Sequence, residues 1–300
     1  MSADRKGEGS SGPDPMPALE FVIVTFNSAH VIGRCLASLP EGAAITIVDN
    51  ASTDGTVDAA LGAGRAVEVL SQRRNLGFGA AANRALRPSR AAYALLLNPD
   101  AVLLPGSSAA LLTSAQKHPD AAIVVPLQYG FDGNVRSLSY LEHPWRRAGL
   151  FVVPDGECCV DVAPGTAMLL VLEKFRRQIG WFDERFFLYA EDTDLCLRVR
   201  SVGYSCILNP EAAVRHDPGN SCNLPDRRFQ QYEFRASQYL FQRKYRIRRF
   251  VVLRSIVKSV LCLFRTASPR RRSDAAAELH AIARFLWRSL KGGSQAWRRA

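Results

Sequence analysis

The chain has 300 residues, of which 47% are hydrophobic, and this is enough for one large core or for a catalytic domain with a smaller appendage. Its net charge of +11 is unevenly distributed, because residues 226–300 carry a net charge of +15 and residues 1–225 carry −4. The charge distribution therefore argues against a nucleic-acid-binding core. It favours a membrane surface or an anionic lipid head group as the partner of the tail.

The N-terminus and the cysteines indicate how the chain is organised. Residues 1–17 are polar, rich in Gly, Ser and Pro, and lack the apolar stretch of a signal peptide, so we expect a disordered leader. A catalytic domain is expected over residues 18–225, followed by a basic amphipathic helical extension over residues 226–300. The seven cysteines show no CxxC spacing, which is typical of reduced thiols in a cytosolic protein.

Apolar strands and helical patterns alternate from residue 19 onward. Four strands are predicted first, at 19–27, 43–50, 66–72 and 91–100, with helices between them at 28–39, 52–62 and 77–86. This alternation predicts an α/β fold, with a mainly parallel sheet that helices cover on both faces. Each strand ends in polar residues, which would gather along the sheet edge where α/β proteins bind ligands.

The alternation loosens in the second half of the domain. The segments predicted there are a helix at 107–119, a strand at 121–129, an irregular excursion over 130–160, a strand and a short helix within 162–180, a helix at 191–203 and a strand at 204–216. No internal repeat is evident, so we expect one catalytic domain.

The fourth strand ends in an unusual way. It passes from Leu97 through Asn98 and Pro99 to Asp100, and apolar residues resume at Ala101. A simple turn would explain the proline and the aspartate. Alternatively, Asp100 is a functional carboxylate at the carboxyl edge of a parallel sheet.

A glycine-rich segment allows a different function. Residues 77–82 fit the pattern GxGxxA between a strand and a helix, and Asp100 follows about 20 residues later, as in dinucleotide-binding proteins. An NAD-dependent Rossmann oxidoreductase is therefore an alternative. However, the pattern follows the third strand rather than the first, and it leaves Asp49, Asp192 and His216 without a role. The glycines could also serve only a tight turn and close helix packing.

Six motifs occur in a fixed order: VTFNS (24–28), IVDNASTDGT (47–56), RNLGFGAAANRAL (74–86), LLLNPDA (95–101), FFLYAEDTDLCLR (186–198) and VRH (214–216). Together they resemble the inverting glycosyltransferase family 2, and especially its bacterial rhamnosyltransferase branch. The resemblance covers residues 19 to about 225 and implies the GT-A fold. It also implies transfer of a sugar, expected to be L-rhamnose from dTDP-rhamnose, to a polyprenyl-diphosphate-linked acceptor in cell-wall or surface-polysaccharide synthesis. A UDP-linked galactofuranose or N-acetylglucosamine donor is the alternative within the family.

The resemblance assigns the metal ligands. Asp100 corresponds to the last aspartate of the family's Asp-x-Asp motif. Asn98 stands in place of the first aspartate, a substitution known in the rhamnosyltransferase branch. His216 corresponds to a second protein ligand. One carboxylate combined with diphosphate oxygens suits Mg²⁺ or Mn²⁺, and an imidazole ligand favours Mn²⁺ slightly.

The resemblance also assigns the general base. The acidic run of Glu191, Asp192 and Asp194 begins a predicted helix, where acidic residues are normally favoured by the helix dipole alone. By resemblance, Asp192 takes the proton from the acceptor hydroxyl, and the helix N-terminus would keep it ionised. Glu191 and Asp194 are secondary candidates.

Nucleotide recognition is expected at the ends of the first strands. The resemblance places Thr25 and Asn27 in the nucleotide pocket and makes Asp49 the acceptor of the pyrimidine N3–H, although an Asx turn would also explain Asp49. The further candidates around the base, ribose and phosphates are Asn50, Ser52, Arg74, Asn75, Gly77 and Asn98. Two other residues of the glycine-rich motif, Gly79 and Asn83, are expected to be structural.

The basic tail suggests a peripheral membrane protein at the cytoplasmic face of the cell membrane. Its segment 248–265 is apolar but too short to span a bilayer, and Arg254 and Lys258 interrupt it. We expect basic amphipathic helices that lie in the membrane interface. The alternatives are a helical cap on the catalytic domain and a surface for homodimer formation.

Overall fold

The computed structural model describes residues 19–136, 153–216 and 227–246, together with residues 256, 257, 260, 261, 275, 276, 279, 280, 282 and 283. The expected disordered leader at 1–17 lies outside the described residues. So do most of the expected membrane-binding tail and part of the excursion at 130–160.

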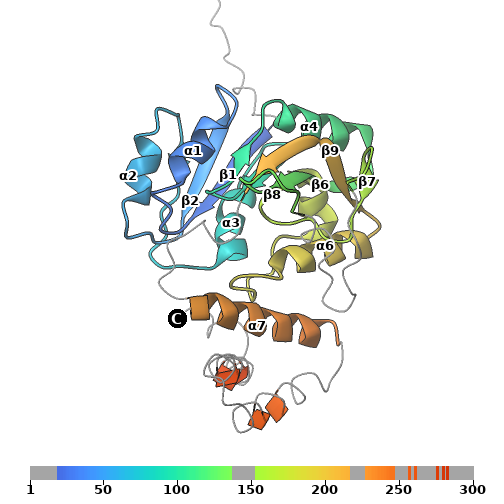
Figure 1. The fold of residues 1–300 in the computed structure, drawn as a ribbon. Helices are drawn as coiled ribbons and strands as arrows, with labels where there is room; N and C mark the ends of the chain where they lie inside the picture. Colours follow the sequence, from blue (N-terminus) through green and yellow to red (C-terminus); the bar gives the residue numbers. More distant parts are fainter. Residues whose placement is uncertain are drawn as a thin grey trace, which may run out of the picture.

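A mixed β-sheet forms the centre of the catalytic domain (Figure 1). Within the described residues its strands follow the order β3-β2-β1-β4-β8-β6-β9-β5, and β7 pairs with β9. Their bounds are β1 Leu19–Thr25, β2 Ala44–Asp49, β3 Glu68–Val69, β4 Tyr93–Leu97, β5 Val102–Leu103, β6 Ala121–Tyr129, β7 Cys158–Cys159, β8 Ala167–Val171 and β9 Ser205–Arg215.

The predicted parallel half of the sheet is present. Strand β1 pairs in parallel with β2 and β4, and β2 pairs in parallel with β3. The predicted third strand is reduced to two residues, because β3 lies at the sheet edge and has only β2 as a partner. In the other half, β8 runs antiparallel between β4 and β6. The register pairs Thr25 with Asp49, so the polar ends of the first two strands lie side by side.

Helices cover both faces of the sheet, as predicted (Figure 1). Their bounds are α1 Ile32–Ala37, α2 Thr56–Leu61, α3 Phe78–Leu86, α4 Ser107–Lys117, α5 Leu172–Lys174, the π-helix η2 Phe175–Ile179, α6 Glu191–Ser201 and α7 Arg227–Lys244. Side chains of β1 alternate between two cores: Phe21 and Ile23 pack with α1 and α4, whereas Val22 and Val24 pack with α3 and α6. This alternation follows from the two-residue period of a strand.

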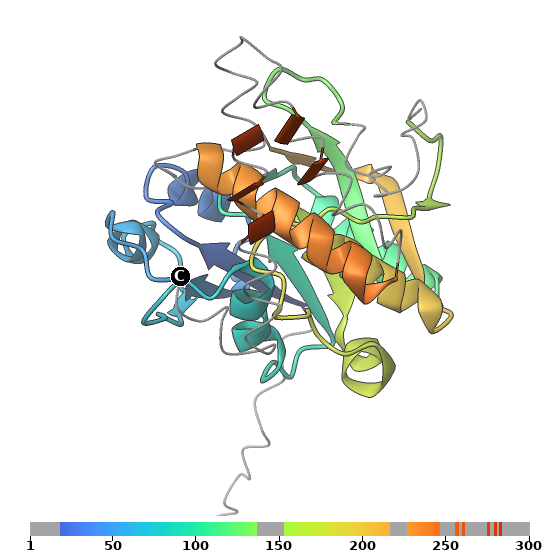
Figure 2. The same ribbon diagram turned by 90° about the horizontal axis from the view of Figure 1, so that it is seen from below.

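Helix α7, the first part of the basic extension, packs against the catalytic domain. Figure 2 shows it running across the molecule when seen from below. It contributes Tyr239, Leu240 and Phe241 to a third apolar cluster, together with Phe186 and Ile282. This part of the extension therefore forms a cap on the domain. No helix in the described ranges is long and apolar enough to cross a bilayer.

Candidate active site

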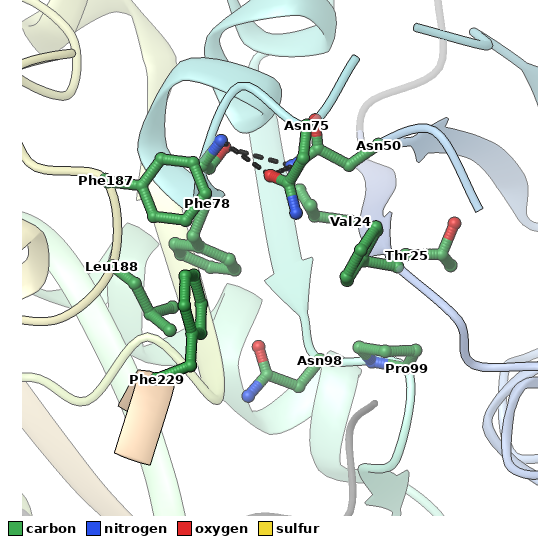
Figure 3. Close-up of a pocket in the computed structure, with 12 residues that line it drawn as sticks. Val24, Thr25, Asn50, Asn75, Phe78, Asn98, Pro99, Phe187, Leu188 and Phe229 are labelled. Carbon is green, nitrogen blue, oxygen red and sulfur yellow. Dashed lines mark hydrogen bonds between the residues drawn. The ribbon is translucent and has the colours of Figure 1, made fainter. Parts of the chain in front are cut away.

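The carboxyl ends of β1, β2 and β4 surround a cavity, as the sequence predicted for this edge of the sheet (Figure 3). One wall is formed by strand ends and the glycine-rich loop, the other by aromatic and aliphatic side chains. The lining residues of the first wall are Val24, Thr25, Phe26, Asn50, Asn75, Gly77, Asn98 and Pro99; those of the second are Phe78, Phe187, Leu188 and Phe229. The sequence did not indicate the apolar wall, to which α7 contributes Phe229.

Asp49 is buried at the end of β2 and holds neighbouring residues in place. Its Oδ1 accepts hydrogen bonds from Thr25 Oγ1 at 3.0 Å and Ser52 Oγ at 2.5 Å, and its Oδ2 accepts one from the Ser52 backbone N–H at 3.0 Å. The Asx-turn alternative is therefore realised. Oδ2 keeps a second lone pair, but Asp49 itself is not among the residues that line the cavity.

Asn27 orders the adjoining loop. It adopts a left-handed conformation with φ of 51°, which asparagine tolerates better than most residues. Its Oδ1 accepts a hydrogen bond from the Thr53 backbone N–H at 2.8 Å, and its own backbone N–H donates to Ser52 Oγ at 2.9 Å. These contacts join the segment that follows β1 to the segment that follows β2.

Asn50 connects β2 to the glycine-rich loop. Its Nδ2 donates to Asn75 Oδ1 at 2.8 Å, and its Oδ1 accepts from the Leu76 backbone N–H at 2.7 Å. Figure 3 shows Asn50 and Asn75 side by side at the cavity. Arg74, the neighbour of Asn75, is exposed.

The two glycines of the GxGxxA segment make close protein contacts. Gly77 has φ of 86°, and a Cβ there would lie 2.2 Å from the carbonyl oxygen of Phe187. A Cβ at Gly79 would lie 2.8 Å from Cβ of Phe182. In a dinucleotide-binding loop the glycines instead let the backbone approach a pyrophosphate. These contacts argue against the oxidoreductase alternative.

Asp100 and His216 form a buried pair, as the resemblance implied. Their side chains are 2% and 7% exposed, and His216 Nε2 lies 3.3 Å from Asp100 Oδ2. The pairing of β5 with β9 brings them together, because Asp100 precedes β5 and His216 follows β9. Neither Asp100 oxygen nor His216 Nε2 has a hydrogen-bond partner within the described part of the chain.

These unbonded atoms fit a divalent cation. An aspartate that served only a turn would bond a nearby backbone N–H, and burying unbonded polar atoms is costly unless a ligand satisfies them. The described ranges contain no cluster of three or more His, Cys, Asp or Glu residues that could hold a metal. The pair therefore suits a cation that takes its remaining ligands from diphosphate and water.

Gln128 is a residue of this site that sequence reasoning missed. Its Nε2 lies 2.7 Å from His216 Nδ1, and its Oε1 is buried without a hydrogen-bond partner among the described residues. The only signal in the sequence is a lone amide within the apolar strand β6. Metal-binding histidines usually donate the second ring N–H to an acceptor, and a glutamine Oε1 can supply one.

Asp192 lies close to the same sheet edge, in the first turn of α6. Its Oδ1 accepts a hydrogen bond from the Thr193 backbone N–H at 2.7 Å, and its Oδ2 accepts one from Gly165 at 3.3 Å. The carbonyl oxygen of Thr166, the residue after Gly165, accepts a hydrogen bond from the backbone N–H of Asn98 at the end of β4. Burial raises the pKa of Asp192, although the two backbone N–H groups oppose this rise. The expectation that the helix N-terminus keeps it ionised thus omitted the effect of burial.

The two other acidic residues of α6 have different environments. Burial raises the pKa of Glu191 well above its ordinary value, and the charge of Asp192 adds to this rise. Asp194 is fully buried and contacts Arg198 at 2.9 Å, as well as Lys244 and Tyr245. These contacts favour a structural role for Asp194.

Comparisons with known proteins agree with these observations. The sequence profile of the family described as "Glycosyl transferase family 2" matches residues 20–168. The N-acetylglucosaminyl-diphospho-decaprenol L-rhamnosyltransferase of Mycobacterium tuberculosis is 30% identical over 237 residues, which are 68% of this chain and 77% of the relative.

Solved structures show a similar fold. A mannosyltransferase from Pyrobaculum calidifontis, solved with GDP-Man and Mn²⁺, has a TM-score of 0.55 at 17% identity, covering 95% of this chain and 78% of that chain. GalNAc-T7, solved with UDP, GalNAc and Mn²⁺, has a TM-score of 0.54 at 16% identity. That match covers 67% of this chain and 43% of that chain, so this chain spans less than half of its length. The predicted GT-A-like fold is confirmed.

Proposed function

Because the chain belongs to glycosyltransferase family 2, we propose that it moves L-rhamnose from dTDP-rhamnose to a polyprenyl-diphosphate-linked saccharide, with inversion at the anomeric carbon. The observation that carries this proposal is the buried Asp100–His216 pair, whose unbonded atoms lie beside the end of β4. The name of the mycobacterial relative, which gives both L-rhamnose and a decaprenol-linked acceptor, supports the donor and the acceptor. The reaction would serve cell-wall or surface-polysaccharide synthesis.

In this proposal Asp100 and His216 would hold Mg²⁺ or Mn²⁺, which would supply positive charge beside the donor diphosphate. Asp49 accepts the pyrimidine N3–H through the remaining lone pair of Oδ2. The other residues assigned to the nucleotide-sugar are Thr25, Asn27, Asn50, Arg74, Asn75, Gly77 and Asn98. Most of them line the cavity or fix the loops around it.

Asp192 acts as the general base in the proposed mechanism. The acceptor hydroxyl attacks the anomeric carbon from the face opposite the diphosphate, and Asp192 removes its proton. The bond between the anomeric carbon and the diphosphate oxygen breaks as the new bond forms, and dTDP leaves with the electron pair. The backbone N–H groups of Thr193 and Gly165 orient the carboxylate. The raised pKa of Asp192 increases its affinity for the proton that it receives.

A panel of nucleotide-sugars tests the donor assignment. We expect sugar transfer or slow donor hydrolysis with dTDP-rhamnose in the presence of Mn²⁺ or Mg²⁺, and no turnover after EDTA treatment. Turnover of UDP-galactofuranose or UDP-N-acetylglucosamine instead would replace the donor while keeping the reaction class. NAD binding without turnover of any nucleotide-sugar would contradict the proposal.

Gln128 is expected to support metal binding through His216. The Nε2 atom of His216 can bind a cation only when Nδ1 carries the ring proton, and a rotated Gln128 amide would accept that proton through Oε1. We therefore expect Gln128→Leu to weaken Mn²⁺ binding about 10- to 100-fold, measured by calorimetry with dTDP present. Gln128→Glu keeps an acceptor at this position and serves as the matched control. Equal Mn²⁺ affinity of the Leu variant and the wild type, with both folded, would refute this role.

We also propose that the tail beyond α7 contacts the cytoplasmic membrane surface. Residues 247–300 contain 13 Lys and Arg but only two acidic residues. Val257, Val260 and Leu261 are 49%, 37% and 42% exposed, at a spacing that gathers them on one helical face. Basic charge combined with exposed apolar side chains is typical of interfacial helices.

Two truncations separate membrane binding from the cap formed by α7. A chain ending at residue 246 keeps α7 but loses Ile256 and Ile282 from its apolar cluster, so we expect it to fold with lower stability and bind donor. It should lose co-sedimentation with anionic liposomes. A chain ending at residue 226 lacks α7 and should be less stable, because Phe186 and Asp194 lose their contacts. If the intact protein does not co-sediment with anionic liposomes at low salt, the membrane proposal is contradicted. Size-exclusion chromatography of both truncated chains would test the homodimer alternative.

A further inference from the structure

The segment that carries the proposed base has an unfavourable backbone conformation. Tyr189 and Ala190 have φ values of 69° and 64°, in the left-handed region that residues with a Cβ rarely adopt. They directly precede Glu191 and Asp192, so their conformation sets the direction in which α6 begins. The N-cap of α6 makes no side-chain hydrogen bond. Contacts outside α6 must therefore hold this turn.

Helix α7 supplies contacts directly at the turn. Ser237 Oγ donates a hydrogen bond to the carbonyl oxygen of Leu188 at 2.7 Å. The ring of Phe234 packs edge-on against Tyr189, with ring centroids 5.7 Å apart. One face of α7 thus holds the backbone and the side chain next to Ala190.

A partly buried lysine of α7, Lys244, joins the two ends of the base-carrying segment, which we define as residues 183–194. Lys244 Nζ lies 2.7 Å from Asp183 Oδ2 and also contacts Asp194 Oδ1. The lysine side chain is 20% exposed, and the Asp194 side chain is fully buried. A partly buried ion pair with two carboxylates is screened less by solvent than a surface pair. Lys244 therefore fixes the distance between both ends of the segment.

The opposite side of the base-carrying segment contacts the glycine-rich loop at Gly77 and Phe78. The backbone N–H of Phe78 donates to the carbonyl oxygen of Phe187 at 2.9 Å, next to the close contact with Gly77. Phe187 also packs edge-on against Phe229 of α7, and both rings line the cavity (Figure 3). The segment is therefore held between the donor cavity and α7.

We propose that Lys244 and Ser237 are positioning residues for Asp192: α7 keeps Tyr189 and Ala190 in the left-handed conformation and so aims the base at the acceptor hydroxyl. This inference rests on the proposed function. It assigns to the first helix of the basic extension a part in the reaction itself. Loss of a positioning contact displaces the base without removing any donor-binding group.

Kinetics of Lys244→Met tests this role. We expect kcat to fall about 10- to 100-fold, the scale of a misplaced catalytic group, while the Kd for dTDP with Mn²⁺ changes less than about twofold. Lys244→Arg keeps a cation within reach of both carboxylates and should restore most of the activity. Lys117→Met breaks a lysine–carboxylate contact of the same 2.7 Å length on α4, to Glu157, and should retain wild-type kcat.

A second-site change separates positioning from general stability. Glycine adopts the left-handed conformation without a Cβ penalty, so Ala190→Gly should recover part of the activity lost in Lys244→Met. Hydrogen exchange should show faster amide exchange over residues 188–192 in Lys244→Met and unchanged exchange at Ser52 and Thr53, which are held by Asn27 and Asp49. Wild-type kcat in folded Lys244→Met, or equal losses in kcat and donor affinity, would overturn the inference.

The same measurements distinguish this inference from the proposed function. If the wild type transfers no sugar from any nucleotide donor, the proposed function fails, whereas hydrogen exchange still reports whether α7 holds the turn. If the wild type is active and Lys244→Met neither loses kcat nor exchanges faster at residues 188–192, the inference fails alone.

Discussion

Replacing Asp192 by asparagine is expected to lower the rate of sugar transfer by about 100-fold or more, which is the usual scale for loss of a general base. Asparagine has nearly the same shape and can still accept the hydrogen bond from the Thr193 backbone N–H, but it cannot take a proton from the acceptor. Donor affinity should therefore remain within about twofold, since no donor contact is lost. Calorimetry with dTDP and Mn²⁺, combined with steady-state kinetics, measures both quantities.

Glu191 provides a matched control for Asp192. Because the pKa of Glu191 is raised in the folded state, its stabilising contribution is present below its unfolded pKa and is lost as pH rises through the folded value. Glu191→Gln is neutral at every pH, so we expect it to keep activity and to stabilise the fold at neutral pH. Normal transfer by Asp192→Asn together with inactive Glu191→Gln would reverse the assignment of the base.

The pH profile gives an independent test of Asp192. Since burial raises its pKa, the base is protonated as pH falls through a value above the ordinary aspartate pKa of about 3.9. The acid limb of kcat/KM should lie above that value and disappear from the residual activity of Asp192→Asn.

The parallel half of the fold could be predicted because its signals are local. Strands β1, β2 and β4 are short apolar runs that end in polar residues, and the helices between them show regular apolar spacing. When such strands alternate with helices along the chain, few topologies other than a parallel sheet are possible. The antiparallel direction of β8 was not predictable from its residues, because a strand buried on both faces has the same composition in either direction.

The site was predictable only where the family resemblance supplied it. The contact between Asp100 and His216 depends on pairing between the two-residue strand β5 and the distant strand β9. No local sequence pattern indicates that these two strands pair. Gln128 became visible only through its contact with His216, and the left-handed turn at Tyr189–Ala190 has no glycine to mark it.

A helical cap was one of the alternatives for the tail, but the proposed positioning role of α7 could not be predicted, for a related reason. Its basic composition suggests a membrane surface, yet Lys244 contacts the buried carboxylate of Asp194 and the partly buried carboxylate of Asp183. The charge of a residue indicates which partners it can have, whereas the fold decides which partner it meets. The Asp194 carboxylate is likewise a secondary candidate for the base in the sequence, and in the fold it contacts Arg198, Lys244 and Tyr245.

The second large effect is expected at Asp100. Asp100→Ala should abolish metal-dependent donor binding, with a loss of at least about 100-fold in dTDP affinity in Mn²⁺, because the carboxylate is the only anionic ligand in the proposed pair. Asp132→Ala removes an exposed carboxylate that is bonded to Asn134 and should leave donor binding unchanged. In contrast to Asp192→Asn, the Asp100 variant should lose donor affinity and turnover together.

A double substitution then tests whether Asp100 and His216 act as one site. If both bind the same ion, the affinity losses of Asp100→Ala and His216→Ala will not add, because either change alone removes most of the metal-dependent affinity. In EDTA, wild type and both single variants should bind dTDP equally and weakly. Additive losses, or variants that differ as much in EDTA as in Mn²⁺, would mean that the residues contact the donor directly. The unbonded oxygens of Asp100 would then be hydrogen-bond acceptors for the donor rather than metal ligands.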